Sequence, residues 1–233
     1  MSWRKDSRGE RGYHHGNLKE ALLQAALGLI AEKGPAGFTF ADAARTAGVS
    51  AAAPYRHFRD RDELVAAVAT GGFDRFAEEL AAAWQNGKPS PAAAYERMGR
   101  AYLDFARRHP ADYIAMFESG VPLEAHEGLQ QAGNRAFGVL REAAEVLVSH
   151  MPAAVRPPAL MVALHTWSLA HGVASLFGRG DAARRKLPMS PDDLLEAGAL
   201  IYLRGLGFPT DQNVHKSDTS TAPKSGPWGT APK

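Results

Sequence analysis

The chain has 233 residues, with 27 Lys and Arg against 25 Asp and Glu, 45% hydrophobic residues and no cysteine. This length allows one or two domains, and the apolar fraction is sufficient for a folded core. The absence of cysteine excludes a disulfide-linked secreted scaffold, a zinc finger or other thiolate metal site, and a cysteine nucleophile.

The beginning of the chain carries charged residues where a signal peptide would need an apolar stretch. We also expect no stretch of about 18 uncharged apolar residues elsewhere, so the sequence predicts no membrane span. These features predict a cytoplasmic protein.

Both ends of the chain differ in composition from the middle. Residues 1–15 contain Arg4, Lys5, Arg8 and Arg11 among few aliphatic residues, which predicts a flexible basic arm. Residues 209–233 have no apolar periodicity and many Pro, Gly and Ser residues, which predicts a disordered tail.

Between the ends, apolar residues recur at helical spacing and strand patterns are absent, so we predict an all-α fold of about nine helices. Asn17 with Glu20 and Asp60 with Glu63 are spaced as capping boxes for two of them. Pro and Gly separate most of the others. The expected helices span residues 17–34, 39–48, from 50, from 60, 91–108, 112–118, 123–150, 157–177 and 190–206.

Residues 39–58 have the pattern of a helix-turn-helix. Gly48 can adopt the left-handed conformation that ends the first helix, and Ser50 can cap the second. Such a pair places its second helix in the major groove of DNA. Because any helical hairpin can carry Gly and Ser in its turn, the turn alone leaves DNA binding open.

The residues after the turn are more specific. Tyr55-Arg56-His57-Phe58, followed by Arg59-Asp-Arg-Asp-Glu-Leu64, resembles the signature of the tetracycline-repressor-like (TetR) family of transcriptional regulators over about residues 16–76. Residues 12–18 and the later Trp167, His171 and Gly172 resemble a subgroup of this family named for a Trp-His-Gly motif. The resemblance implies an N-terminal three-helix DNA-binding domain over residues 16–76 and a helical ligand-binding and dimerisation domain over residues 77–208.

The resemblance also implies which residues face DNA. Thr39, Tyr55, His57 and Arg61 would contact phosphates, with Arg45 close by, and their side chains are donors that fix register without reading sequence. Phe58 would instead lie in the core with Phe38 or Phe40. The full set of expected DNA-binding residues is Thr39, Arg45, Ser50, Ala51, Ala52, Ala53, Tyr55, Arg56, His57 and Arg61.

The start of the expected recognition helix departs from the usual pattern. Alanine methyl groups at residues 51–53 cannot hydrogen-bond to bases, and Pro54 removes a backbone donor, so we expect a distorted helix start. We therefore expect base discrimination to rest on Arg56, the basic arm and DNA deformability. The arm could equally be a solubilising tail.

In the second half, apolar and aromatic residues on several helices could surround a cavity. A mainly hydrophobic or aromatic small molecule would fit such a cavity, although residues of this kind more often pack in a core than contact a ligand. For Trp167 and His171, which are four residues apart, core packing is favoured over ligand contact. The candidate lining is Met98, Tyr102, Phe105, Met116, Phe117, Phe137, Trp167 and His171.

We expect no metal and no cofactor. His165 and His171 are six residues apart and lie on different faces of a helix, whereas a shared ion needs spacing such as i, i+4. The last two helices, near residues 157–177 and 190–206, are expected to pair with those of a second subunit. Their apolar surface would come from Leu160, Leu164, Leu194, Leu195, Ile201 and Leu203.

The sequence therefore favours a homodimeric regulator, most often a repressor in this family, that binds a palindromic double-stranded operator and is released by a small-molecule effector. A DNA-binding or interaction module without ligand control is the alternative. An enzyme is disfavoured because no phosphate loop, nucleophile elbow or two-histidine metal motif is present. Residues 1–61 hold 10 Lys and Arg against 6 Asp and Glu, so the basic excess lies at the expected DNA-binding end.

Overall fold

The structure is a computed structural model that describes residues 18–178 and 188–208. Within these ranges it contains eight α-helices, four short 3₁₀ turns and no strand, which confirms the all-α prediction. The expected basic arm, the expected tail and the Asn17 cap lie outside the described residues. The α-helices are α1 (Leu18–Lys33), α2 (Phe40–Thr46), α3 (Arg61–Trp84), α4 (Pro91–Arg108), α5 (Pro110–Phe117), α6 (Glu127–Ser149), α7 (Ala159–Gly178) and α9 (Pro191–Gly205).

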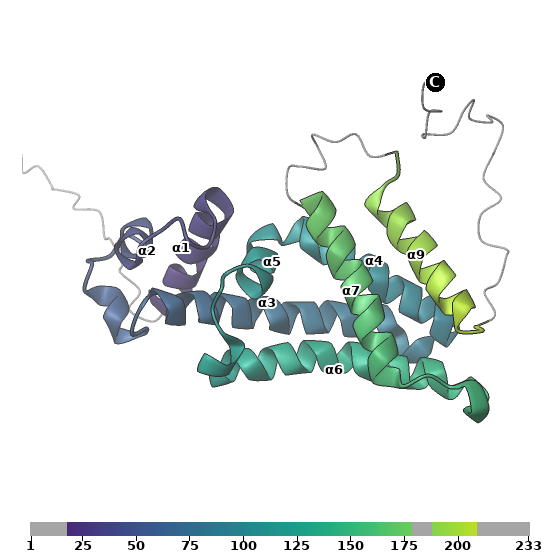
Figure 1. Ribbon diagram of the computed structural model, residues 1–233. Helices are drawn as coiled ribbons and strands as arrows, with labels where there is room; N and C mark the ends of the chain where they lie inside the picture. The colour runs from purple at the N-terminus through teal and green to yellow at the C-terminus, as the bar shows by residue number, and fades with distance from the viewer. Residues whose placement is uncertain (1–17, 179–187, 209–233) are drawn as a thin grey trace, which may run out of the picture.

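Helices α1 and α2 and the beginning of α3 form one end of the molecule (Figure 1). Their shared core contains the fully buried side chains of Leu22, Ile30 and Leu64. Phe58 is also buried, as expected, and Phe38 rather than Phe40 is the aromatic residue buried with it. Burial of such side chains provides most of the stability of this end, at about 1.5 to 3 kcal/mol for each.

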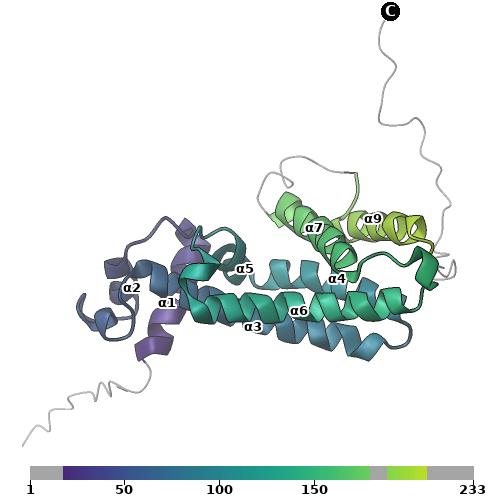
Figure 2. The ribbon, with the colours of Figure 1, turned by 60° about the horizontal axis from the view of Figure 1, so that its bottom comes forward.

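Helix α3 is central to the fold, because α1, α4, α5 and α6 all pack against it. It runs through residue 76 without a break, so the domain boundary that we predict at 76–77 falls inside a helix. Helix α6 lies along it in both ribbon views, and α4 and α5 pack on it as well (Figures 1 and 2). Helices α7 and α9 lie next to each other on the side of α4 (Figure 2).

The helix starts follow the local sequence. The Asp60 carboxylate accepts a hydrogen bond from the Glu63 backbone N–H at 2.9 Å, so Asp60 caps α3 as expected. The Glu63 carboxylate accepts from the Arg59 N–H at 2.7 Å, one residue earlier than in a capping box. Ser190 caps α9 by accepting from the Asp193 N–H at 3.1 Å.

Two of the later predicted helices differ from those in the structure. The segment expected as one helix over 123–150 is a 3₁₀ turn, Leu123–Ala125, followed by α6, because the backbone of His126 is extended between them. Helix α5 begins at Pro110 rather than at residue 112, since proline is well suited to the first helical position.

Helix α7 is long and apolar enough to cross a membrane by length and composition alone, with a mean hydropathy of 1.3. The expectation that no such stretch exists was therefore wrong. In the structure, α7 packs one face against α4, α6 and α9, which buries Val162, Ala163 and Val173, and 28% of its apolar stretch is buried. No other helix of the described residues meets the same criterion.

The expected apolar surface of α7 and α9 is only partly at the surface. Leu160, Leu164 and Ile201 are exposed, at 51%, 40% and 74%. Leu195 and Leu203 are buried instead, so their assignment to a subunit interface was wrong. They point into the core because α9 packs against both α4 and α7, which takes up one face of this helix.

Candidate functional site

The helix-turn-helix begins with a capping box at α2. Thr39 Oγ1 accepts a hydrogen bond from the Asp42 N–H at 3.1 Å and donates one to Asp42 Oδ2 at 2.7 Å. The same carboxylate accepts from the Thr39 N–H at 2.8 Å, and this bond is the main reason why the pKa of Asp42 falls to about 2. Arg45 forms an ion pair with Asp42. The spacing Thr-x-x-Asp could have revealed this box in the sequence.

The turn after α2 has the expected geometry. Gly48 has a φ of 72°, the left-handed conformation that ends a helix, and its N–H donates to the Arg45 carbonyl at 3.0 Å. The Val49 N–H donates to the Ala44 carbonyl at 3.0 Å. These two bonds close the end of α2 and direct the chain into the next segment.

The expected recognition helix is not an α-helix. The structure has a single 3₁₀ turn, Ala53–Arg56, and no side chain caps it. The cap predicted for Ser50 was therefore wrong, and Ser50 contributes only its carbonyl, which accepts from the Ala53 N–H at 3.0 Å. Pro54 lies in the first turn of this segment, where its missing N–H costs no hydrogen bond, and its side chain is fully buried. The segment is distorted, as expected, but the missing donor of Pro54 is not the cause.

The residues expected to face DNA lie on this short segment and around it. Tyr55 is 64% exposed, and its ring packs edge-on against Phe40 at 4.9 Å between centroids. The other exposed members of the set are Thr39, Arg45, Ser50, Ala51, Ala52, Arg56 and His57, whereas Ala53 is half-buried. The structure thus places a hydroxyl, a guanidinium and an imidazole on consecutive residues of one exposed turn.

Arg61 is more constrained than the sequence suggested. Its Nε donates to the Phe38 carbonyl at 3.0 Å, and its guanidinium lies 4.9 Å from the centre of the Phe38 ring. Its Nη1 donates to Asp62 at 2.9 Å. The side chain therefore joins α3 to the segment before α2. The exposed Arg59, which was not among the predicted site residues, forms an ion pair with Glu63 at 3.1 Å.

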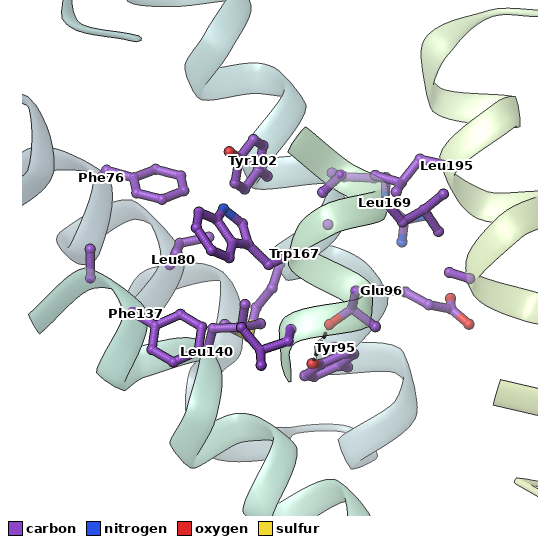
Figure 3. Close-up of a pocket in the computed structure, with 18 of the residues that line it drawn as sticks. Phe76, Leu80, Tyr95, Glu96, Tyr102, Phe137, Leu140, Trp167, Leu169 and Leu195 are labelled. Atoms are coloured by element: carbon purple, nitrogen blue, oxygen red, sulfur yellow. Dashed lines mark hydrogen bonds between the residues drawn. The ribbon is translucent and has the colours of Figure 1, made fainter. Parts of the chain in front are cut away.

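A second candidate site lies in the other half of the molecule. A cavity of about 350 Å³ is lined by residues of α3, α4, α5, α6, α7 and α9 (Figure 3). Six of the eight residues expected around a cavity do line it, namely Met98, Tyr102, Met116, Phe117, Phe137 and Trp167. Residues that the sequence analysis missed include Phe73, Phe76, Leu80, Tyr95, Leu140 and Leu195. The aromatic residues of α3 were missed because that helix was assigned to the DNA-binding end.

Phe105 and His171 are not part of this lining, which corrects their expected position. Phe105 is fully buried behind it, against Phe76 at 4.9 Å between centroids. His171 Nδ1 lies 2.9 Å from the hydroxyl of Tyr102 and 3.0 Å from that of Tyr113, so the ring faces α4 and α5. Burial lowers the pKa of His171, which favours a neutral, hydrogen-bonded ring.

The cavity wall holds a few polar groups among many apolar ones. The hydroxyls of Tyr95 and Thr166 lie 2.7 Å apart and join α4 to α7 (Figure 3). The charged residues of the lining are Glu96, Arg100, Asp192 and Glu196. Within the described ranges, no group of three or more His, Cys, Asp or Glu residues could hold a metal ion. This composition is typical of a pocket for a small organic molecule.

Both halves of the chain match known protein families. Residues 22–68 match the family of bacterial regulatory proteins named tetR, and residues 95–200 match the tetracyclin repressor-like C-terminal domain. No curated protein matches the sequence significantly.

Several solved structures share the fold. A protein of unknown function from a Rhodococcus species is 30% identical, with a TM-score of 0.68 over 84% of this chain and 98% of its own. The TetR family transcriptional regulator PfmR from Thermus thermophilus is 21% identical, with a TM-score of 0.58 over 78% of this chain and 97% of its own. The fatty acid degradation regulator FadR from Bacillus halodurans is 12% identical, with a TM-score of 0.64 over 81% of this chain and 95% of its own.

The two family matches cover the helix-turn-helix and most of the helices that enclose the cavity. Structures of known regulators have the same helical arrangement along most of their length. The chain therefore belongs to the TetR family of DNA-binding transcriptional regulators and is not an enzyme.

Proposed function

We propose that the protein is a cytoplasmic, homodimeric repressor that binds a palindromic operator and releases it when a small, mainly apolar ligand occupies the cavity. The observation that carries this proposal is the continuity of α3. This helix begins at Arg61, four residues after His57, and its later turns contribute Phe73, Phe76 and Leu80 to the cavity wall. One rigid element thus connects the two candidate sites.

A second contact supports the same connection. Helix α5, which contributes Met116 and Phe117 to the wall, packs against α1 as well as α3. Gly72 of α3 lies so close to Met116 that a Cβ atom there would meet Sδ at 2.9 Å. A ligand that moves α5 or α3 would therefore also move α1 and the turn before α3. The difference between the ligand's affinities for the moved and the unmoved arrangement of these helices would set how far the affinity for DNA falls.

On DNA, we assign Tyr55 and His57 to the phosphates, with Arg45 close by. Thr39 would donate to a phosphate only by giving up the hydrogen bond from its hydroxyl to Asp42. Arg56 would be the main side chain available for a base edge, because the Ala51 and Ala52 methyl groups offer only apolar contact. A single 3₁₀ turn presents few side chains to the major groove, so each half-site would be read weakly. A second subunit would compensate by placing an equivalent turn about one DNA turn away.

The dimer is supported by the exposed apolar side chains of α7 and α9. Leu160, Leu164 and Leu176 of α7 and Ile201 of α9 are all at least 40% exposed. The two helices lie next to each other on one side of the molecule (Figure 2). Exposed large apolar side chains on two adjacent helices are typical of a subunit interface.

A module that binds DNA without sequence readout or ligand control remains the alternative function. It is favoured by one observation, the alanine-rich start of the recognition segment. Such a module would bind through counterion release alone, with similar affinity for all sequences.

Removal of the two proposed phosphate donors tests the DNA interface. We expect the double substitution Tyr55→Ala with His57→Ala to weaken binding to operator and unrelated DNA alike, by about tenfold to a hundredfold, at about 0.7 to 1.4 kcal/mol for each lost hydrogen bond. The ratio of the two affinities should stay the same, because phosphate contacts carry no sequence information. Fluorescence anisotropy over a range of salt concentrations measures both affinities and the salt dependence.

The conservative variant Tyr55→Phe is the matched control, since it keeps the ring against Phe40 and loses only the hydroxyl. It should show part of the loss without any change in folding. A loss confined to the operator would contradict the phosphate assignment and place these side chains on bases.

A further inference from the structure

We propose that the cavity selects ligands with an aromatic or otherwise apolar body and one positive charge, for which Glu96 is the counter-ion. This inference rests on the proposed function, because it specifies the class of ligand for the same cavity. It is carried by the distribution of charge among the residues of the lining.

Glu96 stands out among the charged residues of the cavity. It lies on α4, is half-buried, lines the cavity, and its side chain points toward α9 (Figure 3). Its carboxylate has no hydrogen bond and no ion pair within residues 18–178 and 188–208. A half-buried carboxylate without a close partner is costly, and a cation placed beside it would offset that cost.

The other charged side chains of the lining are already engaged. Arg100 forms an ion pair with Glu196 at 3.9 Å. Asp192 accepts a hydrogen bond from Arg107 at 2.6 Å. Burial is the main cause that raises the pKa of Glu96 above its ordinary value. The charge of Arg100 lowers this pKa, and that of Glu196 raises it. The lining thus holds three carboxylates and a single guanidinium, and the carboxylate of Glu96 is the group left for a ligand.

The uncharged part of the wall also favours a cation. Aromatic side chains approach the cavity from α3, α4, α5, α6 and α7, among them Phe76, Phe137 and Trp167 (Figure 3). The face of an aromatic ring carries partial negative charge and attracts ammonium groups. A carboxylate ligand would meet these rings and Glu96, while the one guanidinium of the described lining is paired. An amine attached to an aromatic body therefore fits better than an acid of the same shape.

Three probes of matched shape test this charge preference. 1-Naphthylmethylamine, 1-naphthylmethanol and 1-naphthoic acid share a bicyclic aromatic body and differ in charge at neutral pH. Isothermal titration calorimetry with the full chain should show that the amine binds about tenfold or more tightly than the alcohol and that the acid binds weakest. The substitution Glu96→Gln should remove the advantage of the amine and leave the affinity for the alcohol unchanged.

The control is Glu142→Gln, which removes an exposed carboxylate of α6 outside the lining and should change none of the three affinities. Equal binding of amine, alcohol and acid, or an amine preference that survives Glu96→Gln, would overturn the charge preference while the cavity remained a ligand site. Failure of all three probes to bind would overturn this inference and the proposed ligand site together.

Discussion

The substitution Ile201→Glu is expected to convert the proposed dimer into monomers and to lower operator affinity by about a hundredfold or more. Ile201 is 74% exposed on α9 and lies beyond the core, so a glutamate there leaves the fold of one subunit intact. In a dimer it would bring two like charges into an apolar interface, where they are costly. A dimer that contacts two half-sites binds DNA about two to four orders of magnitude more tightly than a monomer at one half-site, and that advantage would be lost.

Sedimentation velocity and DNA binding of the same preparation measure the two effects. Val155→Glu is the matched control, because Val155 is 63% exposed but lies in a 3₁₀ turn outside α7 and α9. It should leave both the association state and the affinity unchanged. A dimer that persists in Ile201→Glu with normal DNA binding would show that another surface joins the subunits.

The substitution Arg75→Ala is expected to lower the free energy of unfolding by about 2 kcal/mol. Arg75 of α3 donates to Asp112 of α5 at 2.7 Å, and Asp112 is only 6% exposed. Loss of the guanidinium would leave a buried carboxylate without its partner, which costs about 3 to 5 kcal/mol in a fully buried pair. We expect less here because Arg75 itself is 43% exposed.

Asp112→Asn should be far milder than Arg75→Ala. Burial raises the pKa of Asp112 more than Arg75 and His109 lower it, so folding favours the protonated carboxyl. The stability gained in this way is fully present below the ordinary aspartate pKa and is lost as the pH rises through the raised value. At neutral pH the ionised carboxylate is therefore a cost, and the neutral amide should leave stability unchanged or slightly raised and abolish this part of the pH dependence.

Urea unfolding followed by circular dichroism at several pH values compares these variants. Arg135→Ala is the matched control, since Arg135 pairs with Asp74 at the surface, where an ion pair contributes little. An Arg75→Ala variant no less stable than Arg135→Ala, or an Asp112→Asn variant as unstable as Arg75→Ala, would contradict this account.

The parts of the fold that could be predicted from the sequence are those determined by local signals. The glycine at the end of α2, the caps at Asp60 and Ser190 and the burial of Phe58 follow from short patterns. The shape of the recognition segment follows less directly. Pro54 indicated a distorted helix start. How far the segment departs from an α-helix depends on the complete burial of the proline ring, which is a tertiary effect.

The lining of the cavity was likewise predictable only in part. Six predicted lining residues do face it, because aromatic side chains on packed helices converge on one space. Phe76 of α3 and Leu195 of α9 were not expected there, since their positions depend on how far α3 extends and on how α9 packs against α4. His171 differs because its ring is held by two tyrosine hydroxyls from α4 and α5, and no sequence spacing within α7 encodes those contacts.

We propose that residues 39–61 form a DNA interface that reads sequence. Footprinting of the purified full chain on genomic DNA measures this readout. We predict discrete protected sites with two half-sites about one DNA turn apart, retained at physiological salt and lost in the Tyr55→Ala with His57→Ala variant. Uniform, salt-sensitive coverage with no discrete footprint would contradict the claim and favour a module without sequence readout.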